Sequence, residues 1–140
     1  MHLTVHDSDG LPEADLVEAG LDATNAAVPA LRNVRPLVVF AREQDEAVVG
    51  GAVGRTWGEC GELRQLWVAD RRRRRGLGTR LVREFERNAR ERGCRRVYLE
   101  TFSFQAKPFY EKIGYRAPAE IKGFEDGIVK YLMISELRSG

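Results

Sequence analysis

The sequence is poor in cysteine and has no long apolar run. Cys60 and Cys94, its two cysteines, are too few for a disulfide framework or a cysteine-based metal site. We therefore expect two free thiols in a reducing compartment, and no metal. A stretch of about 18 apolar residues is missing, which argues against a membrane-spanning helix. The first residues lack the basic and apolar regions of a signal peptide, so the sequence predicts a cytoplasmic protein without a membrane partner.

The chain also has little net charge. It carries 23 basic and 21 acidic residues, a net charge of +2, whereas nucleic-acid-binding domains usually carry a broad basic field. Aromatic residues do not alternate with the five consecutive arginines at 71–75, as base stacking would require. We expect no nucleic-acid partner, although this arginine run keeps a small nucleic-acid-binding protein open as an alternative.

Length and apolar patterning predict one mixed domain over residues 1–140. The stripe Leu77, Leu81, Phe85, Ala89 predicts an amphipathic helix at 76–92, which Gly93 would end. Strands at 62–68 and 96–101 flank this helix, so we expect a parallel pair with a right-handed crossover. The other expected elements are strands at 3–6, 37–41, 47–55 and 127–137, a helix at 12–30 weakened at Gly20, and a short helix at 103–113 interrupted by Pro108.

Arginine and glycine follow the strand at 62–68 with the spacing Arg73-x-x-Gly76-x-Gly78. The first N–H groups of a helix have no internal partner, and the helix dipole places partial positive charge there. Gly76 and Gly78 leave this backbone open to an anion. The segment therefore predicts a cradle for a pyrophosphate group.

This spacing resembles the acetyl-CoA signature of the GNAT superfamily of N-acetyltransferases (Gln or Arg, two residues, Gly, one residue, Gly or Ala). Residues 103–115 resemble the second motif of that family, written roughly Asn-x-x-Ala-x-x-Leu-Tyr-x-Lys-x-Gly-Phe. The matching positions are Ala106, Phe109, Tyr110, Lys112, Gly114 and Tyr115. Ser103 stands where the family usually has Asn, so its hydrogen bond to the cofactor is shorter in reach or absent. The resemblance extends over residues 36–137.

The resemblance implies the GNAT fold, an α/β (α+β) architecture with a mixed, mostly antiparallel twisted sheet, a splayed central parallel strand pair and flanking helices. It also implies acetyl-CoA as co-substrate, with the pantetheine arm along the splayed strand and the pyrophosphate on the N–H groups of residues 74–79. The implied cofactor-binding residues are Leu66, Trp67, Val68, Arg73, Arg74, Arg75, Gly76, Leu77, Gly78, Thr79, Ser103 and Tyr110. Arg71, Arg72 and Arg75 either meet the 3′-phosphate of CoA or are solvated.

The implied reaction is direct acetyl transfer to a primary amine in a ternary complex. An alkyl amine has a pKa of about 10.4, so a base must remove its proton before attack. Glu62, eleven residues before Arg73, matches the catalytic glutamate of the histone-acetylating branch and would act directly or through water. Strand alternation places Glu62 on one face with Arg64, Leu66 and Val68. Glu100 is the rival base, and Glu62 could instead be a surface carboxylate at the edge of a strand.

Tyr110 matches the family position of the general acid that protonates the leaving thiolate. Its alternative role is that of a packing aromatic, the role we expect for Tyr115 in the core. A non-catalytic acyl-CoA-binding or regulatory module is the alternative to an enzyme.

The sequence says less about the acceptor site than about the cofactor site. By family position it would contact residues 26–35, 57–58 and 118–127. Aromatic and acidic side chains of this region predict an aromatic slot with carboxylates, formed by Trp57, Phe102, Phe104, Phe124, Glu125 and Asp126. Such a slot suits a cationic small-molecule or peptide amine. A homodimer stays open.

Overall fold

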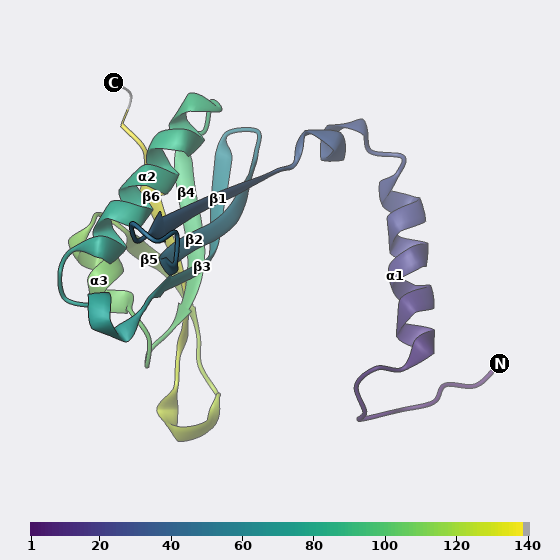
Figure 1. Cartoon of the computed structure of the whole chain (residues 1–140). Coiled ribbons are helices and arrows are strands. Elements are labelled where there is room, and N and C mark those ends of the chain that lie inside the picture. Colours follow the sequence, from purple (N-terminus) through teal and green to yellow (C-terminus); the bar gives the residue numbers. More distant parts are fainter. Residues whose placement is uncertain (139–140) are drawn as a thin grey trace. The chain divides into compact units, whose positions relative to one another are not determined.

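The strands of this chain form one six-stranded sheet in the computed structural model, which describes residues 1–138 (Figure 1). The strand order is β1-β2-β3-β4-β6-β5. Every neighbouring pair is antiparallel except β3 and β4, which are parallel. This confirms the predicted mixed, mostly antiparallel sheet. The strands are β1 Arg35–Arg42, β2 Val48–Trp57, β3 Cys60–Val68, β4 Arg96–Phe102, β5 Arg116–Ile121 and β6 Lys130–Glu136.

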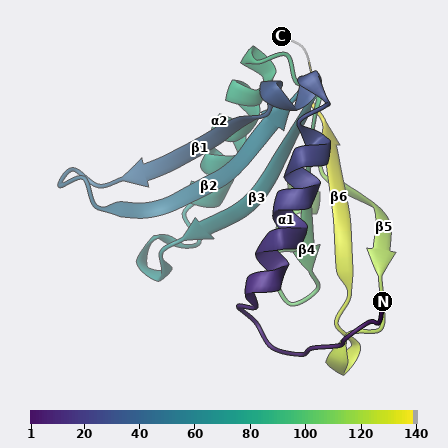
Figure 2. The ribbon, with the colours of Figure 1, turned by 90° about the vertical axis from the view of Figure 1, so that its right-hand side faces the viewer.

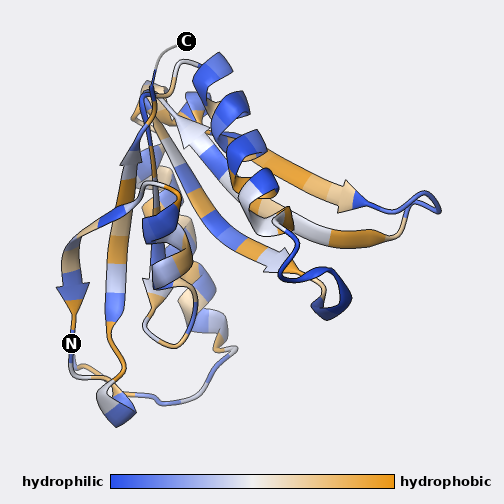
Figure 3. Ribbon diagram, turned by 90° about the vertical axis from the view of Figure 1, so that its left-hand side faces the viewer, coloured by the Kyte–Doolittle hydropathy of each residue, from blue (hydrophilic) through white to orange (hydrophobic). Residues whose placement is uncertain are grey.

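Two helices cover one face of the sheet, α2 at Leu77–Glu91 and α3 at Lys107–Lys112. The predicted apolar stripe of α2 lies against the sheet, with Leu81, Phe85 and Ala89 buried in the core. The outward side of α2 is hydrophilic (Figure 3). Pro108 lies in the first turn of α3, where a proline lacks only an N–H that would have no partner. It therefore begins this helix instead of interrupting it.

The central strands β3 and β4 diverge soon after they begin. In the described chain they pair only at Cys60 with Arg96, Gly61 with Val97 and Glu62 with Tyr98. Beyond these pairs β3 stays bonded to β2, and β4 to β6, so the sheet opens into a V (Figure 2). The splayed parallel pair expected from the GNAT resemblance is confirmed.

A β-bulge interrupts β3 where the V begins to open. Gly54 of β2 pairs with Leu63, and the next residue back, Val53, pairs with Gln65, so Arg64 is an extra residue. The bulge is possible because position 54 has no side chain. A Cβ there would lie 1.9 Å from the carbonyl oxygen of Glu62.

This bulge makes the predicted alternation along β3 wrong. Leu66 pairs with the buried Ala52 and packs against the core on the α2 side of the sheet, as Leu63 does. Glu62 pairs with the exposed Arg55 on the opposite face. One inserted residue shifts the two-residue period, so Leu66 and Val68 do not share the face of Glu62.

The predicted strand at 3–6 is also wrong. No strand pairs with these residues in the described part of the chain. Four alternating residues offer only two apolar side chains, Leu3 and Val5, which is too little surface to hold a strand at a sheet edge. The edge strand β5 lies instead in a region that the sequence left as loop.

The chain divides into two compact units, residues 1–33 and 34–140. The first contains the helix α1 at Pro12–Asn25 and a 3₁₀ helix at Pro29–Asn33. Helix α1 runs through Gly20 and ends at Asn25, so the predicted helix at 12–30 is broken after residue 25. That residues 1–140 fold as a single domain stays a prediction.

Candidate active site

The turn before α2 exposes a row of backbone N–H groups. Arg74 and Gly76 both adopt a left-handed conformation, with φ of 64° and 78°. Left-handed residues in such a turn let successive N–H groups point to one side, which makes a concave anion site. Within residues 1–138, no protein acceptor takes the N–H groups of residues 74–79. Gly76, at the N-cap, tolerates this φ because it has no Cβ.

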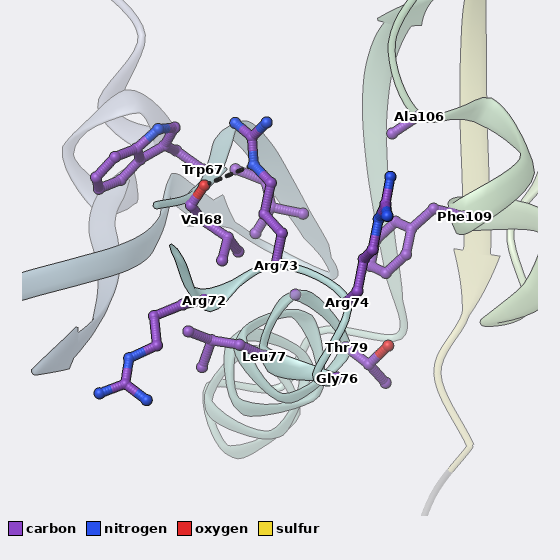
Figure 4. Close-up of a pocket in the computed structure, with 12 residues that line it drawn as sticks. Trp67, Val68, Arg72, Arg73, Arg74, Gly76, Leu77, Thr79, Ala106 and Phe109 are labelled. Carbon is purple, nitrogen blue, oxygen red and sulfur yellow. Dashed lines mark hydrogen bonds between the residues drawn. The ribbon is translucent and has the colours of Figure 1, made fainter. Parts of the chain in front are cut away.

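A cavity of about 470 Å³ lies over these N–H groups, and we name it the cradle cavity (Figure 4). It brings together most of the residues predicted to bind the cofactor. Its lining is Leu66, Trp67, Val68, Arg72, Arg73, Arg74, Gly76, Leu77, Gly78, Thr79, Ala106 and Phe109. Three predicted residues, Arg75, Ser103 and Tyr110, lie outside it.

The arginines of the turn have different partners. Arg73 donates through Nε to the carbonyl oxygen of Val68, at 2.9 Å, and pairs with Asp70. Arg72 is tied to Glu43 in the β1–β2 turn, which raises the pKa of its guanidinium. Arg73 and Arg74 point to the side of the helix end away from Arg72 (Figure 4). The contact with Glu43 accounts for the position of the Arg72 side chain without a bound phosphate.

A second cavity, of about 280 Å³, lies where β3 and β4 have separated. We name it the gap cavity. It shares Leu66 and Ala106 with the cradle cavity, so the two cavities lie next to each other. Its lining is Leu63, Arg64, Gln65, Leu66, Glu100, Thr101, Gln105, Ala106 and Tyr110.

Tyr110 closes the gap cavity from α3. The residue is 6% exposed, and its ring lies edge-on to the rings of Phe109 and Tyr115, with centroids 5.1 and 5.7 Å away. Burial raises the pKa of Tyr110 to about 12, because an apolar surrounding disfavours the phenolate. No group in residues 1–138 hydrogen-bonds its hydroxyl, which leaves that hydroxyl free for a ligand.

A buried hydrogen bond ties the Tyr110 region to α2. Tyr115 donates to Glu86 at 2.8 Å, and Arg83 pairs with the other oxygen of Glu86 at 2.9 Å. Burial and the nearby Glu86 carboxylate raise the pKa of Tyr115. The predicted core position of Tyr115 is confirmed, whereas sequence reasoning missed Glu86. A lone Glu between the apolar Phe85 and Ala89 was its only signal.

The two candidate bases lie on the sheet face opposite α2. Glu62 occupies the last position of β3 that pairs with β4, and its Oε1 accepts from Arg55 Nε at 2.8 Å. Glu100 lies two residues beyond the β4 partner of Glu62, on the same face, and pairs with Lys130 at 2.8 Å. Of the two, Glu100 lines the gap cavity with Tyr110.

Ser103 makes contacts within the fold. Its N–H donates to the carbonyl oxygen of Val129 at 2.7 Å, and its hydroxyl accepts from the Val129 N–H at 3.0 Å. It lines neither cavity, so its predicted cofactor contact stays a prediction. Gln105, two residues further along the same motif, lines the gap cavity, and sequence reasoning missed it.

Part of the predicted aromatic slot is present. Phe102 stacks on Phe104 at 5.4 Å and meets Phe124 edge-on at 5.5 Å. Trp57 does not join them. It pairs with Cys60 at the start of the parallel pair, six residues of β4 from Phe102 and therefore roughly 20 Å away along the strand. The register of β3 against β4, which the sequence did not define, places Trp57 and Phe102 at opposite ends of the strands.

The described residues hold no cluster of three or more histidine, cysteine or acidic side chains suited to a metal ion. Cys60 and Cys94 are both free thiols. In the same part of the chain, no helix is long and apolar enough to cross a membrane.

Comparison with known proteins gives the family. The model of the acetyltransferase (GNAT) family matches residues 10–115. This chain belongs to the GNAT acetyltransferases. It is therefore an acyltransferase enzyme, as the two sequence motifs predicted.

Relatives agree with this assignment. The chain is 38% identical to the blasticidin-S acetyltransferase of Streptomyces morookaense, over 83% of this chain and 92% of that protein. A Bacillus cereus acetyltransferase structure superposes with a TM-score of 0.77 at 26% identity, covering 95% of this chain and 98% of that one. A Bacillus anthracis protein, described as a candidate streptothricin acetyltransferase and solved with acetyl coenzyme A, has the same fold. Its TM-score is 0.66 at 21% identity, over 74% and 64% of the two chains.

Proposed function

We propose that this acetyltransferase holds acetyl-CoA across the cradle and gap cavities and transfers the acetyl group directly to a primary amine in a ternary complex. One observation carries the proposal. The opening between β3 and β4 leads directly to a helix N-terminus whose N–H groups have no acceptor within residues 1–138. A ligand with a thin amide-bearing arm and a pyrophosphate fits both parts.

The pantetheine arm takes the place of a missing strand neighbour. Beyond Glu62, the edge of β3 that faces β4 has no strand partner in the described chain. Buried backbone groups need hydrogen-bond partners, and the amides of pantetheine supply them as an added strand would. Residues 66–68 are the proposed contacts, although the Val68 carbonyl already accepts from Arg73. Its second lone pair remains for the ligand.

The acceptor amine and the leaving thiol then lie on opposite faces of the sheet. Glu62, directly or through water, removes a proton from the ammonium group on the face away from α2. The free amine attacks the thioester carbonyl, so that a C–N bond forms, the C–S bond breaks and the nitrogen passes its second proton to water. Water in turn restores the proton that Tyr110 gives up. The thiolate receives the phenolic proton of Tyr110 from the helix-covered side. Glu100 is the second candidate for the base.

The pKa of Tyr110 suits a proton donor, which must carry its proton until the thiolate forms. At about 12, it keeps the hydroxyl intact over the whole neutral and mildly alkaline range. An exposed thiol has a pKa of about 8.5, which alone would make proton transfer to its thiolate unfavourable. The apolar surroundings that raise the phenol pKa also raise that of a thiolate forming beside it. The pKa of the phenol and the pKa of the thiol therefore both rise in this cavity.

The proposed acceptor is a small cationic amine, and blasticidin S, named in the 38% identical relative, is the first compound to test. The cluster of Phe102, Phe104 and Phe124 lies beside β4 and offers an aromatic surface to a cation. Lys130 already pairs with the neighbouring Glu100 and lies 5.6 Å from the centre of the Phe102 ring, so the acceptor would use the other rings of the cluster. A peptide amine is the alternative acceptor. Any contribution of residues 26–35 stays a prediction.

The test is thiol release from acetyl-CoA in the presence of a panel of amines: blasticidin S, polyamines, amino sugars and a lysine peptide. Release that depends on one amine, with the acetylated product seen by mass spectrometry, supports the proposal. Tight CoA binding with no release for any amine would favour a non-catalytic acyl-CoA-binding module.

A further inference from the structure

The side chain of Gln105 is held by its oxygen in the turn between β4 and α3. Its Oε1 accepts from the Phe102 N–H at 2.8 Å and lies 3.3 Å from the hydroxyl of Thr101, which is buried. The Gln105 N–H in turn donates to the Phe102 carbonyl oxygen at 2.9 Å. The backbone and side chain of this residue are therefore fixed together.

These contacts settle which way the amide faces. A backbone N–H can only donate, so the atom beside the Phe102 N–H must be the oxygen of the Gln105 amide. The nitrogen, with two N–H donors, therefore lies on the other side. No protein group within residues 1–138 accepts from it.

Gln105 also lines the gap cavity beside Ala106 and Tyr110. The Gln105 side chain therefore borders the cavity from the β4–α3 turn, across the gap from the unpaired edge of β3. Because two hydrogen bonds already fix the side chain, little conformational entropy is lost when it binds a ligand. Ser103, which stands at the Asn position of the motif, binds Val129 instead.

We propose that Gln105 donates through Nε2 to an amide carbonyl oxygen of the pantetheine arm, and so holds that arm against β3. The inference rests on the proposed binding of acyl-CoA in the gap cavity. In this chain the side-chain amide that the family motif carries at position 103 is supplied from position 105. Gln105 is a binding residue, and we assign it no proton transfer.

The test is Gln105→Glu, which replaces the donating NH2 of the side chain by an accepting oxygen and keeps the shape of the side chain. One carboxylate oxygen still accepts from Phe102 and Thr101, whereas the other faces the cavity and cannot donate. Calorimetry would compare two ligands, CoA and 3′-phosphoadenosine 5′-diphosphate, which lacks the pantetheine arm. We expect CoA affinity to fall by about 10- to 100-fold, because bound CoA would cover a carboxylate oxygen that faces its carbonyl oxygen and cannot donate to it. Affinity for the diphosphate should not change.

An unchanged CoA affinity, or an equal loss for both ligands, would overturn the Gln105 contact. If Gln105→Glu does not fold, Gln105→Met removes the donor without adding a charge, and the same selective loss is expected. Failure of the proposed acyl-CoA site looks different, because the unmodified protein would then bind neither ligand and the Gln105 proposal would fall with it.

Discussion

Tyr110→Phe isolates the chemistry of a single hydroxyl. The ring packs edge-on between Phe109 and Tyr115, and the phenylalanine ring keeps that packing. If the hydroxyl protonates the thiolate, turnover should fall by about 10²–10⁴-fold, the usual contribution of a general acid. Acetyl-CoA affinity and the melting temperature should change little, because no protein group within residues 1–138 bonds this hydroxyl. Steady-state kinetics and calorimetry measure both quantities.

The pKa of Tyr110 adds a pH dependence to this prediction. Its value is raised from about 10 in the unfolded chain to about 12 in the folded one, so the folded state holds the proton more tightly. The resulting stabilisation is complete below pH 10 and is lost between pH 10 and 12. Wild-type turnover should therefore show no loss from Tyr110 ionisation up to about pH 11. A decline with a pKa near 10 that disappears in Tyr110→Phe would contradict the burial of this hydroxyl.

Glu62→Gln tests the base at the apex of the V. The amide can keep a bond to Arg55 but cannot take a proton from the acceptor. Turnover should fall most at neutral pH and recover in part as alkaline pH deprotonates the amine, whose pKa is about 10.4. Acetyl-CoA affinity should not change. Full pH–rate profiles provide the measurement.

Glu100→Gln is the matched control, because Glu100 lies on the same face and is likewise held by a cation, Lys130. Our proposal expects the smaller effect there. Wild-type rates for Glu62→Gln across the whole profile, with a loss in Glu100→Gln, would transfer the role of base to Glu100.

At the scale of elements, the bulge in β3 depends on one glycine of the neighbouring strand. A Cβ at position 54 would lie 1.9 Å from the Glu62 carbonyl oxygen and 2.8 Å from the Phe85 ring. Both obstacles are rigid, so Gly54→Ala should lower the free energy of unfolding by about 1–3 kcal/mol or more, as overpacking does. Urea denaturation measures the loss.

The same substitution at Gly51, in the same strand, is the control. There the nearest atoms lie 3.3 Å away and include the movable ring of Phe40, so a smaller loss is expected. Equal stabilities for the two variants would mean that the bulge relaxes without cost.

The elements that the sequence predicted well are those whose signal is local. Strand, glycine turn and helix follow one another around the cradle, and the stripe of α2 lies within one segment. The bulge could not be predicted, because it depends on two strands at once. Arg64 is the extra residue in β3, and the room for it comes from Gly54 on β2, which has no side chain. Strand β5 was missed because its six residues are all exposed and include Pro118, as edge strands allow.

For the whole molecule, the function depends on a sheet that separates into two halves. β1, β2 and β3 remain bonded on one side, and β4, β6 and β5 on the other, with α2 covering strands of the first half (Figure 2). Within residues 1–138, strand pairing joins the two halves at three residue pairs. A ligand that lies between them and bonds both edges adds contacts that the free protein lacks. The acyl-CoA is thus expected to contribute to the stability of the fold.

Acetyl-CoA should therefore raise the melting temperature, because a ligand that binds only the folded state shifts the folding equilibrium by mass action. At 100 times its dissociation constant it would add about 2.7 kcal/mol. Gly78→Val should remove most of this shift. A Cβ at position 78 lies 3.4 Å from the Phe109 ring, and the two methyl groups of valine would fill the cradle cavity between α2 and α3.

Gly78→Ala provides the graded control, since its Cβ makes ordinary contacts with Phe109 and the family signature accepts alanine at this position. Differential scanning fluorimetry, run with and without acetyl-CoA, should give a ligand-induced shift that decreases from glycine to alanine to valine. Because the variants could also differ in intrinsic stability, each shift is measured against the same variant without ligand. An undiminished shift in Gly78→Val would place the pyrophosphate elsewhere and remove the cradle from the site.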